Sequence, residues 1–323
     1  MESTKTLGES RGMSDYVGRF APSPTGPLHF GSLVAAVASY ADARAARGTW
    51  LLRIEDVDTA RCSQSAETEI RRQLAAYGFQ HDGEVIRQSE RSEHYEAALQ
   101  ELENTDVLFA CTCTRRQLDS AARNAEGEII YPGTCSHKQE TGLTHALRVR
   151  VPDSTDSLIS FTDRARGTIT QNLFADVGDF VLRRADGLYA YRLAVVVDDS
   201  LQGVTHVVRG EDLLFNTPRQ IFLQRLLGYQ TPVYLHVPLA RNRSGEKLSK
   251  QTRARALATD NVLPALHETW AFLGQTPVGP VQSIAAFWQR AIELWSVAPL
   301  VALSPASPGE HSDRVPAAAT QIL

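Results

Sequence analysis

The chain has 323 residues, 43% of them hydrophobic, which is enough for one large domain or two modest ones. Its formal net charge of −4 excludes a globally basic nucleic-acid-binding protein, so any RNA contact has to come from a local patch. No run approaches the roughly 18 apolar residues of a membrane span. Residues 1–15 lack the apolar core of a signal peptide and are expected to be a disordered extension. We therefore expect a cytoplasmic monomer that does not bind membranes.

The first third of the chain has the pattern of a parallel α/β unit. Residues 17–21 predict a short strand, and a Pro/Gly-rich loop leads from it into an alanine-rich helix that runs from Leu28 to a stop at Gly48. The apolar run 49–56, TWLLRIED, has strand length and ends in acidic residues. Ligands in such sheets bind beyond the carboxyl ends of the strands. The loop and Glu55 both fall at that edge.

The remaining segments differ in composition. Helices are predicted at 65–77 and 89–104, and the short β-like runs of 105–185, with their scattered Gly and Pro, predict an inserted module. Long apolar runs return after residue 186 and predict a second α/β half. The last twenty residues, 304–323, are rich in Pro, Ser and Ala and are expected to be disordered.

The Pro/Gly loop within GRFAPSPTGPLHFGSL, residues 18–33, is a candidate phosphate site. A loop that closes onto a helix N-terminus gathers free backbone N–H groups and the positive end of the helix dipole. His29 and Gly31 fall at that turn, and a glycine lets a ligand approach the backbone closely. Taken alone, the loop is equally well explained as a rigid turn, because one Gly-rich loop is a weak signal.

A second candidate is the polar stretch GEKLSKQ, in which Lys247 and Lys250 flank Ser249. Most such lysine pairs belong to solvated loops. Mobile cations are also what a departing pyrophosphate requires, because negative charge moves onto the leaving group in the transition state. The stretch therefore predicts phosphate chemistry only in combination with a second signal.

Three of the four cysteines could form a metal site. Cys111 and Cys113 form a C-x-C pair, and Cys135 follows 22 residues later. Three thiols could supply three of the four ligands of a tetrahedral zinc site, and the alternative is that they are buried free thiols. Cys62 lies apart from the others and has no predicted role.

The loop and the lysine stretch together resemble the two signatures of class I aminoacyl-tRNA synthetases. PLHFGSL matches the first with His29, Phe30, Gly31 and Ser32, and KLSKQ matches the second at 247–251. Further stretches resemble the glutamyl-tRNA synthetase branch over about 17–275: LLRIEDVD, GFQHDG, QSERSEHY and VVVDDSLQGVTHVVRGEDLLFNTPRQ. Only 72 residues follow Gln251, fewer than the anticodon-reading domains of that branch occupy. The chain thus resembles a truncated subfamily that attaches glutamate to queuosine in tRNA(Asp).

The resemblance implies a role for each matching residue. The residues that would bind glutamate, with arginines on its carboxylates and an acid on its amino group, are Arg19, Ala21, Ser23, Glu55, Tyr191 and Arg209. Those that would bind ATP with Mg²⁺ are His29, Gly31, Ser32, Lys247, Ser249 and Lys250, of which His29 and Lys250 are implied to be catalytic. The implied ligands of one structural zinc are Cys111, Cys113, Tyr131 and Cys135, with His137 as an alternative to the tyrosine.

Two positions depart from the pattern of the branch. Ser32 replaces the final histidine of the first signature, which the glutamyl branch tolerates. Arg192 follows Tyr191 where asparagine is common. Arg192 would alter substrate contacts if it faced the pocket, and we expect it to point outward instead.

The implied fold is α/β, a Rossmann-type parallel sheet split by an inserted zinc-binding module and followed by a short helical C-terminal segment. Its expected parts are the catalytic halves 16–104 and 186–251, the acceptor-binding-like zinc module 105–185 and the helical segment 252–303. The implied activity is ATP-dependent activation of glutamate and its transfer to queuosine of tRNA(Asp). The alternatives are a truncated glutamyl-tRNA synthetase that charges tRNA(Glu), and a non-catalytic RNA-binding paralogue.

Overall fold

A computed structural model of the chain describes residues 15–136, 145–240 and 255–303. The predicted strand–loop–helix–strand order of the first third is confirmed. β1 (Val17–Phe20), β2 (Thr49–Ile54) and β3 (Ile86–Arg87) pair in parallel in the order β1-β2-β3. They are connected by α1 (Phe30–Ala45) and α2 (Gln64–Ala76). The unit therefore has the βαβ connectivity that places ligands at the carboxyl ends of its strands.

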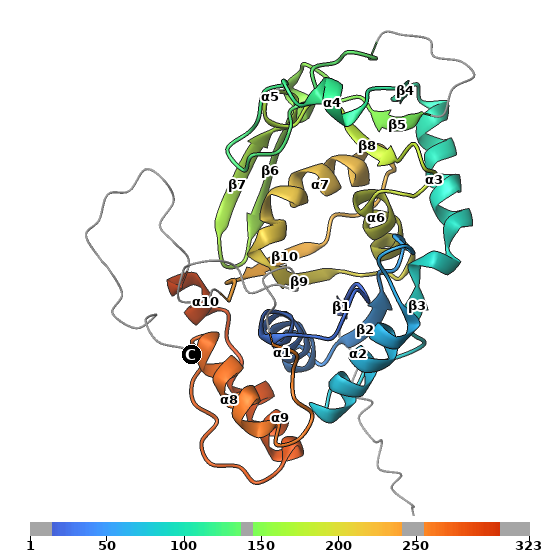
Figure 1. Ribbon diagram of the computed structural model, residues 1–323. Helices are drawn as coiled ribbons and strands as arrows, with labels where there is room; N and C mark the ends of the chain where they lie inside the picture. Colours follow the sequence, from blue (N-terminus) through green and yellow to red (C-terminus); the bar gives the residue numbers. More distant parts are fainter. Residues whose placement is uncertain (1–14, 137–144, 241–254, 304–323) are drawn as a thin grey trace, which may run out of the picture.

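A second parallel unit follows later in the chain. β9 (His206–Gly210) and β10 (Val233–Val237) are parallel neighbours joined by η3 (Glu211–Asn216) and α7 (Thr217–Leu226). β9 lies next to β1, because the Val17 amide donates to Thr205 Oγ1 at 2.9 Å and the Thr205 amide donates to Val17 O at 2.9 Å. The carboxyl ends of β1 and β9 thus meet at one edge (Figure 1).

The chain between these units forms an antiparallel sheet and a hairpin. Entered through η1 (Gln88–Glu90) and α3 (Ser92–Asn104), the sheet contains β4 (Leu108–Cys111), β5 (Ala146–Val149) and β8 (Phe180–Arg183) in the order β4-β5-β8. The hairpin pairs β6 (Leu158–Asp163) with β7 (Gly167–Asn172). The short helices of this region are α4 (Arg115–Leu118), η2 (Thr155–Ser157) and α5 (Leu173–Asp176).

The predicted segment 105–185 is not separate from the second parallel unit. β6 pairs in parallel with β10 through Asp163 and Tyr234, so the second sheet has the order β7-β6-β10-β9. This pairing places Asp163, which belongs to the predicted insertion, beside β10, the strand that follows α7.

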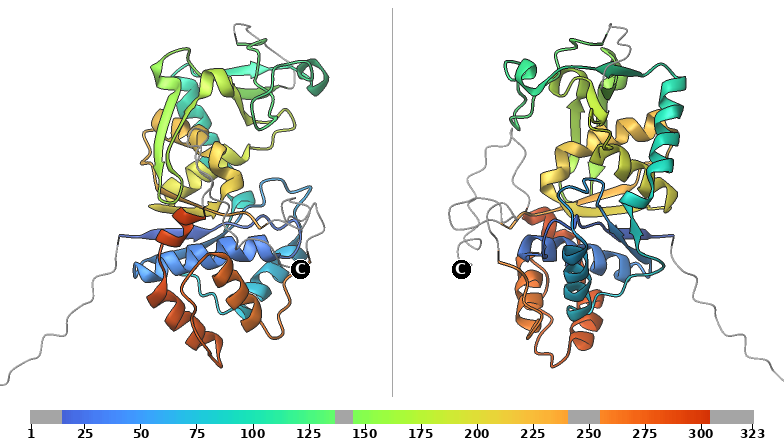
Figure 2. Two further views of the ribbon diagram at one scale, coloured as in Figure 1. Left: turned by 90° about the vertical axis from the view of Figure 1, so that its left-hand side faces the viewer. Right: turned by 45° about the vertical axis from the view of Figure 1, so that its right-hand side comes forward.

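Helices cover the parallel strands. α1 and α6 (Tyr191–Leu201) bury consecutive residues on all faces, as expected for helices that are apolar all round. α8 (Leu263–Phe272) and α9 (Ile284–Leu294) pack beside α1, and α10 (Ala298–Ala302) follows (Figures 1 and 2). Trp288 of α9 lies edge-on to Tyr40 of α1 and donates to the Tyr77 carbonyl at 2.9 Å. Of the helices described, none is long and apolar enough to cross a bilayer.

Candidate active site

A cavity of about 520 Å³ opens where β1 and β9 end. Its wall comes from β1 and the loop that follows, the first turn of α1, Tyr191 at the start of α6, and the end of β9. Predicted site residues that line it are Arg19, Ala21, Ser23, His29, Gly31, Ser32, Tyr191 and Arg209. The structure therefore brings residues of both parallel units to one hollow, although they are far apart in the sequence.

The floor of the cavity includes the N-terminus of α1. His29 is the N-cap residue of this helix, and its Nδ1 accepts a hydrogen bond from the Ser32 amide at 3.4 Å. The first turn of α1 contains no acidic residue that would offset the helix dipole. Ala256 forms a β-bridge with His29. A helix N-terminus open to a cavity favours an anionic ligand such as a phosphate.

Arg209 at the end of β9 lines the cavity, and one nitrogen of its guanidinium lacks a partner among the described residues. Its Nη2 donates to Thr217 Oγ1 at 2.8 Å and its Nε donates to His236 Nε2 at 3.1 Å. The side chain is buried, and its Nη1 has no hydrogen-bond partner among the described residues. A buried guanidinium nitrogen without an acceptor is costly, and a ligand carboxylate would satisfy it.

A histidine and an aspartate fix the orientation of Arg209. His236 of β10 is fully buried, and its Nδ1 lies 2.7 Å from Oδ2 of Asp163 at the end of β6. Because a carboxylate can only accept, Nδ1 carries the proton and Nε2 keeps the lone pair that accepts from Arg209. Burial lowers the pKa of His236 to about 4, so the ring is neutral at physiological pH.

Arg19 lies on the cavity wall within a buried network of charges. Its guanidinium pairs with Asp199 of α6, with Nε at 3.1 Å from Oδ1. Arg53 of β2, which is fully buried, pairs with the same carboxylate at 2.8 Å and with Glu55 at 3.4 Å. Asp199 therefore bridges two arginines and holds Arg19 at the edge of the cavity.

Glu55 lies behind this wall rather than on it, because it is not among the residues that line the cavity. Burial raises the pKa of Glu55 to about 7, although Arg53 and Arg19 oppose the shift. A bound ammonium group would favour the charged carboxylate. Burial likewise raises the pKa of Tyr191 to about 12, with nearby Glu55 adding to the shift, so the phenol stays protonated and can donate.

Arg192 does not line the cavity. Its Nε donates to Asn216 Oδ1 at 3.1 Å, and its guanidinium lies 6.0 Å from the centre of the Phe180 ring. Arg192 is therefore directed away from the pocket, as expected, and its half-buried side chain packs against the start of α7 and β8.

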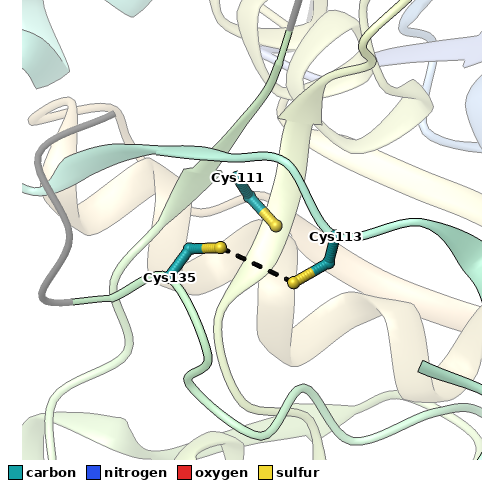
Figure 3. A group of neighbouring side chains, drawn as sticks. All are labelled: Cys111, Cys113 and Cys135. Atoms are coloured by element: carbon teal, nitrogen blue, oxygen red, sulfur yellow. Dashed lines mark hydrogen bonds between the residues drawn. The ribbon is translucent and has the colours of Figure 1, made fainter. Parts of the chain in front are cut away.

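Three cysteines of the middle region gather as the C-x-C pattern predicts (Figure 3). The sulfur atoms of Cys111, Cys113 and Cys135 all lie within 4.8 Å of one another, and those of Cys113 and Cys135 are 3.5 Å apart. Tetrahedral zinc–thiolate bonds of about 2.3 Å place sulfur atoms roughly 3.8 Å apart, so the spacing suits a zinc ion. All are free thiols.

Tyr131 completes this cluster on its fourth side. Its hydroxyl lies 3.5 Å from the Cys111 sulfur and 3.8 Å from the Cys113 sulfur, and it accepts from the Cys135 amide at 2.8 Å. Gly178 makes this position possible, because a Cβ there would lie 2.6 Å from the Tyr131 carbonyl oxygen. The alternative fourth ligand, His137, lies outside the described residues.

Comparison with known proteins shows the family of the chain. The family described as "tRNA synthetases class I (E and Q), catalytic domain" matches residues 16–265. Proteins named glutamyl-Q tRNA(Asp) synthetase from Thiobacillus denitrificans and Verminephrobacter eiseniae are 53% and 54% identical, over 93% and 87% of this chain and 95% and 97% of theirs. The chain belongs to the glutamyl-Q tRNA(Asp) synthetase family. The family predicted from the sequence motifs is thereby confirmed.

Solved structures place the family within the class I fold. A glutamate tRNA ligase from Elizabethkingia meningosepticum, solved with its amino acid, superposes with a TM-score of 0.62 at 30% identity over 74% of this chain. The chain spans about half of that protein, 52% of its length. A Mycobacterium tuberculosis methionyl-tRNA synthetase gives a TM-score of 0.55 at 14% identity, which shows a shared α/β fold.

Some residues of this glutamyl-Q tRNA(Asp) synthetase family member were found only in the structure. Asp199, which also pairs with Arg53, holds Arg19, while His236, itself bonded to Asp163, holds Arg209. The paired aspartates in VVVDDS, polar residues within an apolar helix, were the available signal for Asp199. Three predicted ATP-binding residues of the second signature lie outside the described residues: Lys247, Ser249 and Lys250.

Proposed function

We propose that the protein activates glutamate with ATP and transfers it to queuosine in the anticodon of tRNA(Asp). The observation that carries the activation step is that Arg209, whose buried Nη1 lacks a partner among the described residues, lines the same cavity as the first turn of α1. A carboxylate site beside a phosphate site is what joining an amino acid to ATP requires. The names of the close relatives support the choice of acceptor.

In the first step, an α-carboxylate oxygen of glutamate attacks the α-phosphorus of ATP, and the bond to the departing pyrophosphate breaks. Arg209 binds one carboxylate of the substrate, and the negative charge of Glu55, which lies behind the wall formed by Arg19 and Tyr191, attracts the ammonium group without direct contact. The N-terminus of α1 with His29 binds the phosphates. Mg²⁺ bound with ATP would neutralise charge on the triphosphate. The protein contributes positioning and charge stabilisation rather than a covalent intermediate.

In the second step, a hydroxyl of the acceptor attacks the carbonyl carbon of the mixed anhydride, and AMP leaves. The cyclopentene diol of queuosine offers such a hydroxyl within an anticodon loop. Loop nucleotides are the part of an RNA that proteins can read as unstacked bases. The acceptor is the part of the proposal that distinguishes it from an ordinary glutamyl-tRNA synthetase.

We expect labelled glutamate to enter tRNA(Asp) that carries queuosine and not the same RNA with guanosine at that position. The two RNAs differ only in the base that supplies the diol, so the comparison isolates the acceptor group. ATP–pyrophosphate exchange with glutamate, measured without RNA, checks the first step separately. Equal labelling of the unmodified RNA, or robust labelling of tRNA(Glu), would restore the alternative of a truncated glutamyl-tRNA synthetase. A complete lack of exchange would favour the non-catalytic RNA-binding paralogue.

We also propose that Cys111, Cys113, Cys135 and Tyr131 hold one structural zinc ion in the segment 105–185. The support is the arrangement of three free thiols and one phenol around a single point. The cluster sits against Phe109 and Leu118, so it can replace a hydrophobic core for this small region. The metal would thereby fix the chain that faces the start of α6 and α7.

Purified protein is expected to contain about one zinc per chain, and Cys113→Ser is expected to lose it and to lower the unfolding temperature of the region. Cys62→Ser is the matched control, because Cys62 lies outside the cluster and should leave the zinc content unchanged. Tyr131→Phe tests the phenol ligand. Elemental analysis that finds no zinc in wild-type protein prepared without chelators would contradict the site.

A further inference from the structure

Two arginines lie side by side outside the active-site cavity, at the starts of α6 and α7. The Arg192 Nε donates to Asn216 Oδ1 at 3.1 Å, and Nη1 of Arg219 donates to the same oxygen at 3.3 Å. Arg219 is only 2% exposed, and its Nη2 pairs with Glu128 from the segment between β4 and β5. We call these four residues the arginine cluster.

The arginine cluster carries more positive charge than its surroundings balance. Among the described residues, Glu128 is the one anion paired with a guanidinium group of the cluster, and it contacts Arg219. Burial and the neighbouring Arg219 lower the pKa of Arg192 to about 10, which shows how unfavourable a second cation is here. The Nε atom of Arg219 is buried without a partner in the described part of the chain. The cluster is therefore one anion short of balance.

The helices add to this imbalance. Arg192 and Arg219 belong to the first turns of α6 and α7, where the helix dipole is positive and basic side chains are unfavourable. Neither helix has a side-chain cap on its N-terminal amides. Two guanidinium groups that share one Asn216 oxygen, beside two helix starts without side-chain caps, form an environment suited to an oxyanion.

The anion now present can be displaced from the surface. The Glu128 side chain is 43% exposed, whereas that of Arg219 is 3% exposed. Its carboxylate therefore reaches inward from solvent to a buried cation. The terminal nitrogens of Arg192 have no hydrogen-bond partner among the described residues and are not fully enclosed. Arg192 also directly follows Tyr191, which lines the active-site cavity, so the cluster adjoins a lining residue in the chain.

We propose that the arginine cluster binds a backbone phosphate of the acceptor RNA near the nucleotide that receives glutamate, and that Glu128 occupies the phosphate position until RNA displaces it. This inference rests on the proposed function, which places RNA at the mouth of the cavity. A phosphodiester offers the oxygens that both guanidinium groups can share. The overall charge of −4 gives no general attraction for RNA, so a local cationic site of this kind is needed.

The test measures binding of the full-length protein to a fluorescent anticodon stem-loop that contains queuosine. Arg192→Gln should weaken binding about fivefold to eightfold at 0.1 M salt and reduce the slope of log affinity against log salt by about 0.7–0.9, the value for one lost phosphate contact. Glu128→Gln should strengthen binding, because it removes the competing carboxylate. Arg225→Gln, an exposed arginine in the last turn of α7, is the matched control and should change nothing.

The outcomes separate this site from the proposed function. Exchange of pyrophosphate with glutamate and ATP should stay within about twofold of wild type in Arg192→Gln, since no described contact of Arg192 reaches the cavity. Wild-type affinity and salt slope in Arg192→Gln, or weaker binding in Glu128→Gln, would overturn the site alone. If inorganic phosphate stabilises the wild type against thermal unfolding and Arg192→Gln binds RNA as the wild type does, the cluster is a site for free anions and not for RNA. Failure of wild-type protein to bind the stem-loop would refute the proposed function as well.

Discussion

Replacing Arg209 with alanine is expected to reduce kcat/KM for glutamate in pyrophosphate exchange by about 100- to 1,000-fold. Removing one partner of a buried, hydrogen-bonded charge pair costs on the order of 3–4 kcal/mol, and about 1.4 kcal/mol is a factor of ten. The effect should be large because Nη1 has no acceptor among the described residues, while Nε and Nη2 are already held in place. The guanidinium is therefore preorganised for the substrate before it binds.

Three measurements test this role of Arg209. ATP affinity should change little in Arg209→Ala, because the phosphates are expected at the N-terminus of α1. Arg209→Lys keeps the charge but loses the fork geometry, so it should recover only part of the activity. Arg225→Ala, on the exposed face of α7, is the control and should behave as wild type. If Arg209→Ala retains its kcat/KM for glutamate, or wild-type enzyme uses glutamine within tenfold of glutamate, the carboxylate site is wrongly assigned.

The elements that could be predicted from the sequence are those with a local signal. The first βαβ unit was visible because its strand, loop and helix follow one another and differ in composition. β1 begins at Val17 as predicted, and α1 begins at Phe30, two residues after the predicted start. The helix expected at 89–104 begins three residues later, because 88–90 forms a separate 3-10 turn. The antiparallel sheet β4-β5-β8 could not be derived, since its strands are distant in the sequence and no local pattern indicates which strands pair.

The residues of the candidate site likewise fall into those with a local sequence signal and those that only the fold brings together. His29, Gly31 and Ser32 were identified from one contiguous motif, and they line the cavity together. The residues that hold Arg209 have no such signal, because His236 is 27 positions away on β10 and Asp163 lies 73 positions before that histidine. Asp163 also comes from the segment that composition assigns to an insertion. Only the parallel pairing of β6 with β10 brings it behind the arginine.

Asp163→Asn is expected to raise the KM for glutamate by about tenfold to a hundredfold. The cavity volume should not change, since the two side chains have nearly the same size. Asp163 Oδ2 receives both the amide and the ring Nδ1 of His236, at 3.0 and 2.7 Å. Its Oδ1 receives the amides of Ala165 and Arg166, both at 2.9 Å. An asparagine that keeps its oxygen on these two amides must turn its NH₂ group toward His236.

That NH₂ group can only donate, so Nδ1 of His236 must become the acceptor and the ring proton must move to Nε2. Nε2–H would then face the Nε–H of Arg209, and two donors at 3.1 Å repel where one bond existed. The arginine loses its alignment while its charge remains, so KM for glutamate should rise with little change in KM for ATP.

¹⁵N NMR should show His236 protonated at Nδ1 in wild type and at Nε2 in the variant, which a merely structural aspartate would not produce. Because the pKa of His236 is about 4, wild-type glutamate binding should show no histidine titration between pH 6 and 8. Unaltered glutamate KM in Asp163→Asn, or a wild-type ring protonated at Nε2, would disprove the positioning role.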